Sequence, residues 1–371
     1  MIERVRFTRA AFAAILTAFF APAAHADETP IERAPQAPAA ADPKEARTGL
    51  GGTQQGRAGA AGAYGELGLG YDSNITGVLA DYGAAAQQSF NLAGIRATGN
   101  FSKRHAAFMQ GAIGGEYDRP LGGGWSVFAG GEARGRAYVR ESDFNITAGE
   151  ARAGGALEDG SNQLRVTASF APSWQRGAAS GDPRPTNDRR MAGLNLDWRH
   201  AVDTSTQLGL AMQLSGVRFP RSSIEDFDQA YLSASWLRSF EGKGAPLIYL
   251  TAFVTADHAR NSFENGVSGT STRSKNLGGL RSYVQYSIAP KLQVFNGLGA
   301  IYRKDKDAFA RSTKVPNGHD WYGEASMGLA WQFRDKCTLR LQLAYARNDS
   351  NIAIYDFNRN EISSVIRCDM N

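Results

Sequence analysis

Two adjacent histidine and aspartate pairs are the side chains of this sequence best suited to acid or base chemistry. The pairs are Asp257-His258 and His319-Asp320. A histidine that is held by a carboxylate can activate a water molecule. The sequence places no second acidic pair and no serine nucleophile with them, so we interpret both pairs as polar residues at strand ends and expect no enzyme. His105 and His200 receive the same interpretation.

The two cysteines, Cys337 and Cys368, could form a disulfide. Cys337 opens the penultimate strand-like segment and Cys368 closes the last one. In an antiparallel pair centred on residues 351–353 they would face each other, on the outer side of both strands. An oxidising compartment favours the bond, with two unpaired thiols as the alternative. No histidine adjoins either cysteine, so we expect no metal site, and we find no cofactor motif.

A two-residue period indicates the elements that position these groups. In "CTLRLQLAYA" (residues 337–346), leucines alternate with Thr338, Arg340 and Gln342. Successive side chains of a β-strand point to opposite faces, so this segment has one apolar and one polar face. The same pattern recurs at 163–174, 191–199, 207–215 and 321–333.

The length of these segments favours a membrane protein over a soluble sandwich. They run for about ten residues or more, whereas strands of soluble proteins have about five or six. About ten tilted residues cross a bilayer, and in lipid only a closed barrel satisfies every backbone group of a sheet. We therefore predict an all-β fold, a transmembrane antiparallel up-and-down β-barrel in the outer membrane of a Gram-negative-type bacterium. Outer-membrane lipid is then a partner, and a periplasmic sandwich is the alternative.

The connections between the segments alternate between short and long, which predicts about fourteen strands with both termini in the periplasm. The segment 89–101 could itself be a strand, but we place it in the first long loop to keep the strand number even. The short connections are 119–124, 158–161, 203–206, 241–245, 289–291 and 334–336. The long ones are 73–104, 140–143, 175–190, 218–227, 259–276, 304–319 and 347–360.

The N-terminal 26 residues have the features of a secretory signal peptide: early arginines, an apolar stretch, and Ala24-His25-Ala26 as the cleavage site. The apolar stretch is short for the alternative, a transmembrane anchor. Residues 27–63 are rich in alanine, proline and glycine and predict a flexible periplasmic linker, with the barrel at 64–371. Removing the leader lowers the net charge from +5 to +3, because three arginines and one glutamate leave. With no basic cluster, nucleic acid is not an expected partner.

Charged residues on the polar faces are predicted to line the barrel interior. Ion pairs that fill a narrow barrel are one interpretation, and a polar path for a solute or a polypeptide is the other. No loop has the long charged segment typical of a selective porin constriction. These predicted lumen charges are Glu66, Glu132, Arg134, Arg136, Arg165, Asp197, Arg199, Arg281, Glu324 and Arg340.

The tetrapeptide DSNI occurs twice. Because the first and last strands of a closed barrel are neighbours, we expect both copies on the extracellular side of the closing seam. There, aspartate and asparagine side chains can bond the local backbone and hold a turn. A chance match is the alternative. The residues are Asp72, Ser73, Asn74 and Ile75 in the first copy and Asp349, Ser350, Asn351 and Ile352 in the second.

The segments "GYDSNITG" and "SNIAIYDFNRNEI" resemble the C-terminal barrel of the surface lipoprotein assembly modifier family. The resemblance implies a barrel of the same strand number that helps lipoproteins to reach the cell surface. A typical member also has a periplasmic domain of tetratricopeptide-type repeats, whereas residues 27–63 are too short for one repeat pair. The chain also ends in "VIRCDMN" and not in the terminal aromatic residue common in such barrels.

Two functions follow as expectations. The leading one is a barrel that assists translocation or surface display of an exported protein or lipoprotein client, through a weakly paired closing seam. The alternative is a solute channel or porin-like barrel, which the mixed lumen charges motivate.

Overall fold

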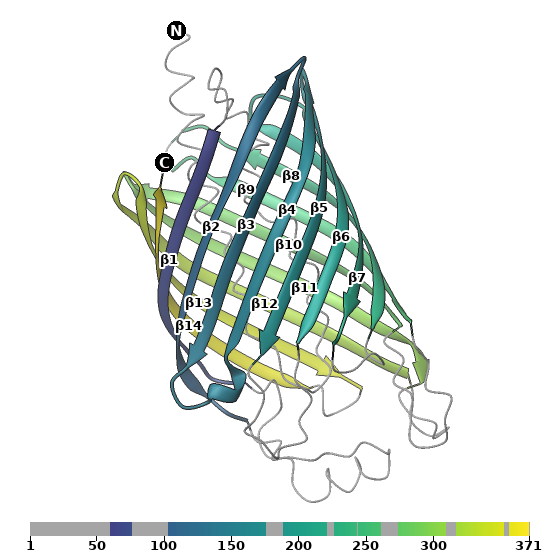
Figure 1. The fold of residues 1–371 in the computed structure, drawn as a ribbon. Helices are drawn as coiled ribbons and strands as arrows, with labels where there is room; N and C mark the ends of the chain where they lie inside the picture. The colour runs from purple at the N-terminus through teal and green to yellow at the C-terminus, as the bar shows by residue number, and fades with distance from the viewer. Residues whose placement is uncertain are drawn as a thin grey trace, which may run out of the picture.

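The computed structural model describes residues 60–75, 103–175, 188–220, 226–242, 244–260, 274–308, 317–351 and 356–370. In these residues, antiparallel strands form a closed barrel in which each strand pairs with its neighbours in sequence and β1 pairs with β14 (Figure 1). The predicted fold class and strand number are confirmed. The strands are β1 (Ala60–Asp72), β2 (Ala106–Gly122), β3 (Trp125–Tyr138), β4 (Ile146–Asp159), β5 (Asn162–Gln175), β6 (Arg189–Ala201), β7 (Thr206–Arg218), β8 (Phe227–Ser239), β9 (Leu247–Ala259), β10 (Lys275–Ala289), β11 (Leu292–Ala308), β12 (Asn317–Arg334), β13 (Cys337–Ser350) and β14 (Phe357–Met370), with one 3-10 turn, η1 (Ser142–Phe144).

The barrel has a turn end and a loop end. At the turn end, strands are joined at residues 123–124, 160–161, 202–205, 240–246, 290–291 and 335–336, and there β1 begins and β14 finishes. The loop end holds the connections after β1, β3, β5, β7, β9, β11 and β13. Tight hairpins need left-handed backbone, and the β2–β3 turn supplies it at Gly123 and Gly124, with φ of 60° and 82°. All six short connections lie where the sequence predicted them.

Several strands are longer than the sequence indicated. β11 continues to Ala308 and β12 begins at Asn317, so the loop predicted at 304–319 is shorter than expected. β13 ends at Ser350 and β14 begins at Phe357, so the loop predicted at 347–360 is also shorter. Most residues of these ends are polar, which removes the apolar alternation but leaves the backbone ladder in place, as the pairing of Lys304 with His319 demonstrates. β1 likewise begins at residue 60, before the predicted boundary at 64. The predicted signal peptide, most of the predicted linker, and the segment 89–101 lie outside the described residues.

The outer face of the barrel is an apolar band. On β7, Leu208, Leu210, Met212 and Leu214 are 40%, 49%, 43% and 49% exposed, and every described strand except β4 presents comparable residues or aromatic rings at some positions. Isolated apolar side chains are ordinary on a soluble surface, but a contiguous band of them is the lipid-facing surface of a transmembrane barrel. Among the residues that the structure places, no helix is long and apolar enough to span a membrane.

Candidate functional site: the polar inner wall and the closing seam

The inner wall of the barrel is polar. Strand alternation turns all ten predicted lumen charges inward, opposite the apolar outer residues of the same strands. Arg165, Asp197 and Arg340 are buried at 4%, 6% and 8% exposure, whereas the Arg134 side chain keeps 42% of its surface. The wall therefore combines buried charges with charges that remain open to the interior.

Most of these charges are paired. Arg367 contacts Glu66 at 2.9 Å, Arg136 contacts Glu361 at 3.0 Å, and Arg165 contacts Glu116 at 3.3 Å. Further pairs are Arg199 with Asp197 at 2.6 Å, Arg281 with Glu324 at 3.0 Å, and Arg134 with Glu132 at 3.7 Å. The wall therefore contains ion pairs both between strands and within single strands, and both signs of charge are present on it.

Several partners in these pairs are absent from the predicted lumen charges. Arg359, Glu361 and Arg367 all lie on β14, whose first residues were assigned to a loop. The signal was present, because "FNRNEI" places Phe357, Arg359 and Glu361 on one face by the two-residue period. Glu116 was not predicted as a lumen charge for another reason. The glycines around it in "GAIGGEYD" interrupt the alternation of apolar and polar residues in β2.

A repeated three-residue unit builds much of the inner wall. An aromatic ring on one strand lies over the directly paired glycine of the next strand, and an arginine guanidinium lies over the ring. Phe108 covers Gly70 and carries Arg136, whose Cζ is 3.9 Å from the ring centroid. A Cβ added at Gly70 would meet the Phe108 ring at 2.3 Å, so only glycine leaves room for the ring. The other units are Gly114–Tyr64–Arg367, Gly154–Phe128–Arg165, Gly328–Phe295–Arg340 and Gly279–Phe253–Arg281, the last with a wider separation of 5.6 Å.

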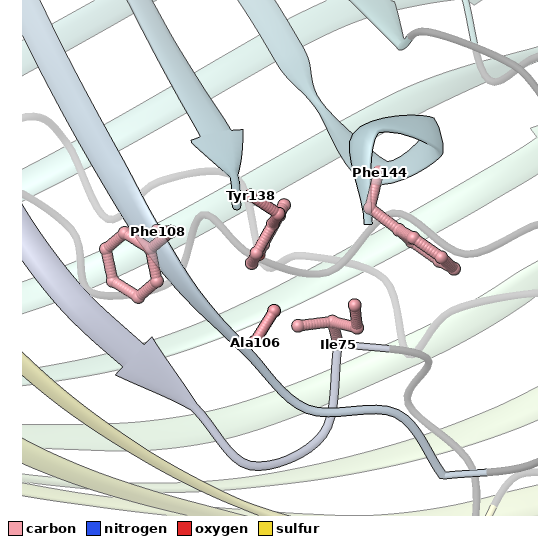
Figure 2. Packing of buried hydrophobic residues seen from close by; sticks show 5 residues of the cluster. All are labelled: Ile75, Ala106, Phe108, Tyr138 and Phe144. Carbon is pink, nitrogen blue, oxygen red and sulfur yellow. The ribbon is translucent and has the colours of Figure 1, made fainter. Parts of the chain in front are cut away.

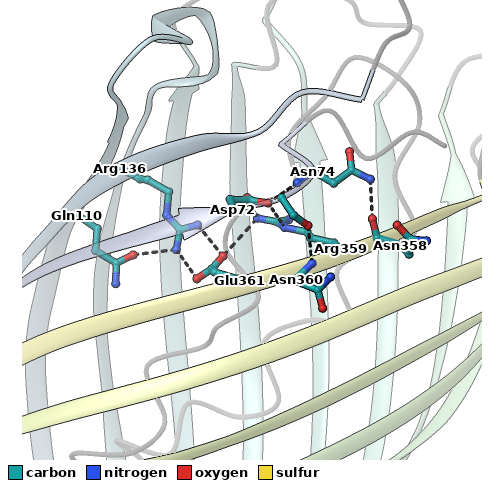
Figure 3. A network of polar contacts seen from close by, with 9 residues as sticks. Asp72, Asn74, Gln110, Arg136, Asn358, Arg359, Asn360 and Glu361 are labelled. Atoms are coloured by element: carbon teal, nitrogen blue, oxygen red, sulfur yellow. Dashed lines mark hydrogen bonds and ion pairs between the residues drawn. The ribbon is translucent and has the colours of Figure 1, made fainter. Parts of the chain in front are cut away.

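The seam between β1 and β14 is fully paired. Its register runs from Ala63 opposite Met370 to Asp72 opposite Glu361 without a shift. At the loop end, Arg359 donates to Asp72, and Glu361 accepts from Arg136, which also donates to Gln110 (Figure 3). The expectation of a weakly paired seam is therefore wrong, because side chains of both signs cross it and the backbone ladder is complete.

The first DSNI copy belongs to this seam. Asp72 Oδ1 accepts a hydrogen bond from the backbone N–H of Asn74 at 2.9 Å, which closes the expected local turn. The Asn74 side chain donates to the carbonyl of Asn358 at 2.7 Å, and Ser73 exchanges hydrogen bonds with the Asn360 backbone (Figure 3). Asp72 and Asn74 are completely buried. The tetrapeptide thus joins the end of β1 to the start of β14.

The second copy has different surroundings. Asp349 faces outward and pairs with Arg347 at 2.7 Å, while the Ser350 hydroxyl donates to Asp320 and Asn351 bonds the His319 backbone. It therefore joins β13 to β12 and not to the seam, which corrects the expectation that both copies lie there. The two aspartates occupy opposite faces because strand register, and not sequence identity, sets side-chain direction. Ile352 lies outside the described residues.

An apolar cluster lies beside the seam at the loop end. Ile75, Ala106, Phe108, Tyr138 and Phe144 are buried together, with Phe144 supplied by η1 (Figure 2). The rings of Phe108 and Tyr138 meet edge to face at 5.9 Å. Ile75 is 2% exposed, so the last residue of the first DSNI copy anchors the chain after β1 against β2 and β3.

The two histidine and aspartate pairs are split between faces. Asp257 and Asp320 point inward and are buried, whereas His258 and His319 are exposed on the outer side. Adjacent strand residues cannot turn to one face, so neither pair can form an acid–base dyad. His105 and His200 lie at strand ends, where their rings lie near Tyr71 and Trp198. Within the described ranges, no group of three or more histidine, cysteine and acidic side chains could hold a metal ion.

Cys337 and Cys368 form the predicted disulfide. They are directly opposite each other in the β13–β14 register and lie on the outer side at the turn end. The bond fixes the last hairpin next to the point where β14 finishes.

Two turn-end carboxylates are stabilised in their ionised form. The hydroxyl and backbone N–H of Ser205 and the N–H of Thr206 donate to Asp203, and these bonds lower the pKa of Asp203 to about 2. The Lys291 ammonium, 2.9 Å from Asp335, lowers the pKa of that carboxyl in the same direction. Both groups hold the short turns at neutral pH.

Comparison with known proteins gives similarity to solved structures alone. No family model and no curated protein matches the sequence. The outer membrane channel DcaP of Acinetobacter baumannii is 12% identical, with a TM-score of 0.46 over 84% of this chain and 98% of that one. OmpT, an outer membrane protein of Vibrio cholerae, is 10% identical, with a TM-score of 0.44 over 85% and 99%. An anion-selective porin from Comamonas acidovorans is 9% identical, with a TM-score of 0.41 over 84% and 100%.

Proposed function

We propose that this chain is an outer-membrane channel for small polar solutes, with both termini in the periplasm. The supporting observation is the inner wall, which is polar from Arg367 near the turn end to Arg359 at the loop end. Polar side chains on the inner wall do not contact lipid. They can offer hydrogen bonds to a solute that enters the barrel from water. Since acidic and basic side chains of the wall are paired with each other, the path would discriminate weakly between anions and cations.

The closed seam favours passage through the interior over lateral release. Opening β1 from β14 would break a continuous ladder, the buried Asp72–Arg359 pair and the Glu66–Arg367 pair together. Removing one partner of a buried ion pair costs about 3–5 kcal/mol, because the other charge is left buried without compensation. A client that leaves through this seam would have to offset all of these losses at once.

Single-channel recording tests the proposal. We expect discrete conductance steps from the purified barrel in planar bilayers, and a silent bilayer would refute a channel. The chain also offers an internal control, because Ser235 faces inward and Ala234 faces lipid. A Ser235→Cys variant should lose conductance when a charged methanethiosulfonate reagent is added, whereas Ala234→Cys should not. The native cysteines do not interfere because they are joined.

Assistance to surface display of an exported lipoprotein is the second candidate. It is favoured by the resemblance of "GYDSNITG" and of the last hairpin to the surface lipoprotein assembly modifier barrel, since those residues join β1 to β14. Antibody labelling of a neighbouring-gene lipoprotein on intact cells tests it. Loss of labelling when the barrel is deleted would support this role, and unchanged labelling would exclude it for that client.

A further inference from the structure

Four basic side chains lie on the outer face of the barrel at the loop end of β9, β11 and β12. Lys304 pairs directly with His319 on β12 and with Asn276 on β10. Lys306 follows Lys304 on the same face of β11, and His258 lies at the end of β9. All four basic side chains are exposed. We name His258, Lys304, Lys306 and His319 the basic outer patch.

The acidic side chains of the same strand ends point into the barrel. Asp257 and Asp320 are buried on the inner side, although each adjoins a histidine of the patch in the sequence. Asp305, between the two lysines, pairs in register with the buried Lys275 and therefore also faces inward. Among the side chains that the structure describes on β9 to β12, the patch has no acidic neighbour on the outer face.

The positive charge of the patch is not neutralised within it. Asp228 lies opposite His258 on the outer side of β8, but it already pairs with Arg218 at 2.9 Å and with Arg260 at 2.7 Å. The Lys304 ammonium has no ion-pair partner among the residues that the structure describes. An anion from outside the chain can supply that partner, and phosphate suits lysine.

Toward the middle of the barrel, the patch adjoins two aromatic rings and then the apolar band. Tyr302 pairs directly with Trp321, and their ring centroids are 5.0 Å apart. Trp321 is 58% exposed, and such rings are typical of the boundary between membrane and water. Lys304 lies two residues beyond Tyr302, about 7 Å along the strand. The exposed Leu280 and Leu298 continue the same outer face below the rings, so the patch lies at headgroup level above lipid-facing side chains.

We propose that the basic outer patch binds the phosphate of a phosphorylated glycolipid in the outer leaflet. The inference rests on the proposed placement of both termini in the periplasm, which puts the loop end in that leaflet, and not on conduction. Phosphate oxygens accept charge-assisted hydrogen bonds from Lys304 and Lys306, and a histidine ring can donate a further N–H. The acyl chains of the same molecule would cover Leu280 and Leu298. A soluble anion would use the charged part alone, whereas a lipid uses both parts.

Native mass spectrometry of the full-length barrel in detergent, titrated with lipid A that carries two phosphates, tests the site. We expect Lys304→Gln to raise the dissociation constant about fivefold, the usual effect of one lysine at a charged lipid surface. Adding Lys306→Gln should raise it to about 25-fold if the two lysines act independently. Lys103→Gln is the matched control, because it removes a lysine from the same end of the barrel, where its ammonium bonds Asn358 of β14. We expect the control to bind as the native chain does, and heat-modifiable gel migration establishes that each variant is folded.

The outcomes separate the parts of this inference. Equal binding of lipid A and of its dephosphorylated form would overturn the phosphate assignment, and equal weakening by Lys304→Gln and Lys103→Gln would overturn the location. Displacement of lipid A by millimolar inorganic phosphate would overturn the choice of a lipid over a soluble anion.

Two further measurements separate the inference from the proposals on which it could depend. Arg140 is exposed at the loop end, so an Arg140→Cys variant should react with a membrane-impermeant maleimide on intact cells. Absence of that reaction would overturn the placement in the outer leaflet. Lipid A binding by a barrel that gives no conductance would support the patch and refute the channel, whereas a conducting barrel that binds no lipid A would do the reverse.

Discussion

Arg359 of β14 donates hydrogen bonds to the carboxylate of Asp72, the last residue of β1, across a separation of 287 residues in the chain. Asp72 is completely buried and Arg359 nearly so. Glu361 accepts hydrogen bonds from Arg359 and from Arg136 of β3. One cluster of acidic and basic side chains therefore joins β1, β3 and β14. The closing seam, which we expected to be weakly paired, is held together by these charges.

Replacing Asp72 by Asn should destabilise the barrel by about 3 kcal/mol, because Arg359 would remain buried with a weaker partner. The free energy of unfolding in urea, followed by intrinsic fluorescence in detergent, measures the change. Asp349→Asn is the control: it removes the aspartate of the other DSNI copy, which is outward and exposed. We expect it to leave the free energy unchanged, and equal effects of the two variants would contradict the assignment of the seam.

A methyl group at Gly70 should disturb the unit that carries Arg136. The added Cβ would meet Phe108 at 2.3 Å and the Ile362 carbonyl oxygen at 2.7 Å, so the ring must move off its glycine. We expect Gly70→Ala to cost about 2 kcal/mol of stability, the usual effect of overpacking. Gly323→Ala provides the comparison, since a Cβ there meets nothing within 4 Å. Urea midpoints of the two variants should therefore differ clearly, and matching midpoints would count against the unit.

Reduction of the Cys337–Cys368 bond should lower stability by about 3 kcal/mol, since it frees the chain that the bond closes over a separation of 31 residues. Unfolding midpoints with and without dithiothreitol measure the change. A Cys337→Ser, Cys368→Ser double variant should match the reduced protein and should not respond to the reductant. A midpoint that reductant leaves unaltered in the native chain would show that the bond adds nothing to stability.

The turn at Asp203 should contribute a pH-dependent share of stability. Its folded pKa, near 2, lies below the ordinary carboxyl value, so the contribution is present above about pH 4 and is lost as the pH falls toward 2. We expect Asp203→Asn to be less stable than the native chain at pH 6, with the difference shrinking as the pH falls to 3. Urea titrations at both pH values provide the check, and a difference independent of pH would mean that the carboxylate is not the source.

The fold could be predicted from the sequence because the alternation and the connection lengths are local signals. The spacing of Leu339, Leu341 and Leu343 identifies the outer face of β13 from this segment alone. Pairing partners are different, since they depend on the register between strands that are far apart in the chain. Glu66 could be placed in the lumen from its own neighbours, but its contact with Arg367 follows only from the closure of β1 on β14.

The DSNI repeat illustrates the same limit. Identical residues predicted identical roles, yet Asp72 is an inner residue of the seam and Asp349 an outer residue of β13. The disulfide was predictable because its two cysteines flank one hairpin, where sequence spacing and register are linked directly.

Pairing of the first strand with the last has a consequence for biogenesis. Until β14 has been delivered, the edges of β1 and β13 expose unsatisfied backbone groups, which lipid cannot hydrogen-bond. The partial sheet must therefore be sheltered by another protein or wait in the periplasm until the whole chain has arrived. In either case the barrel can stand alone in the bilayer only after the C-terminal hairpin has joined β1.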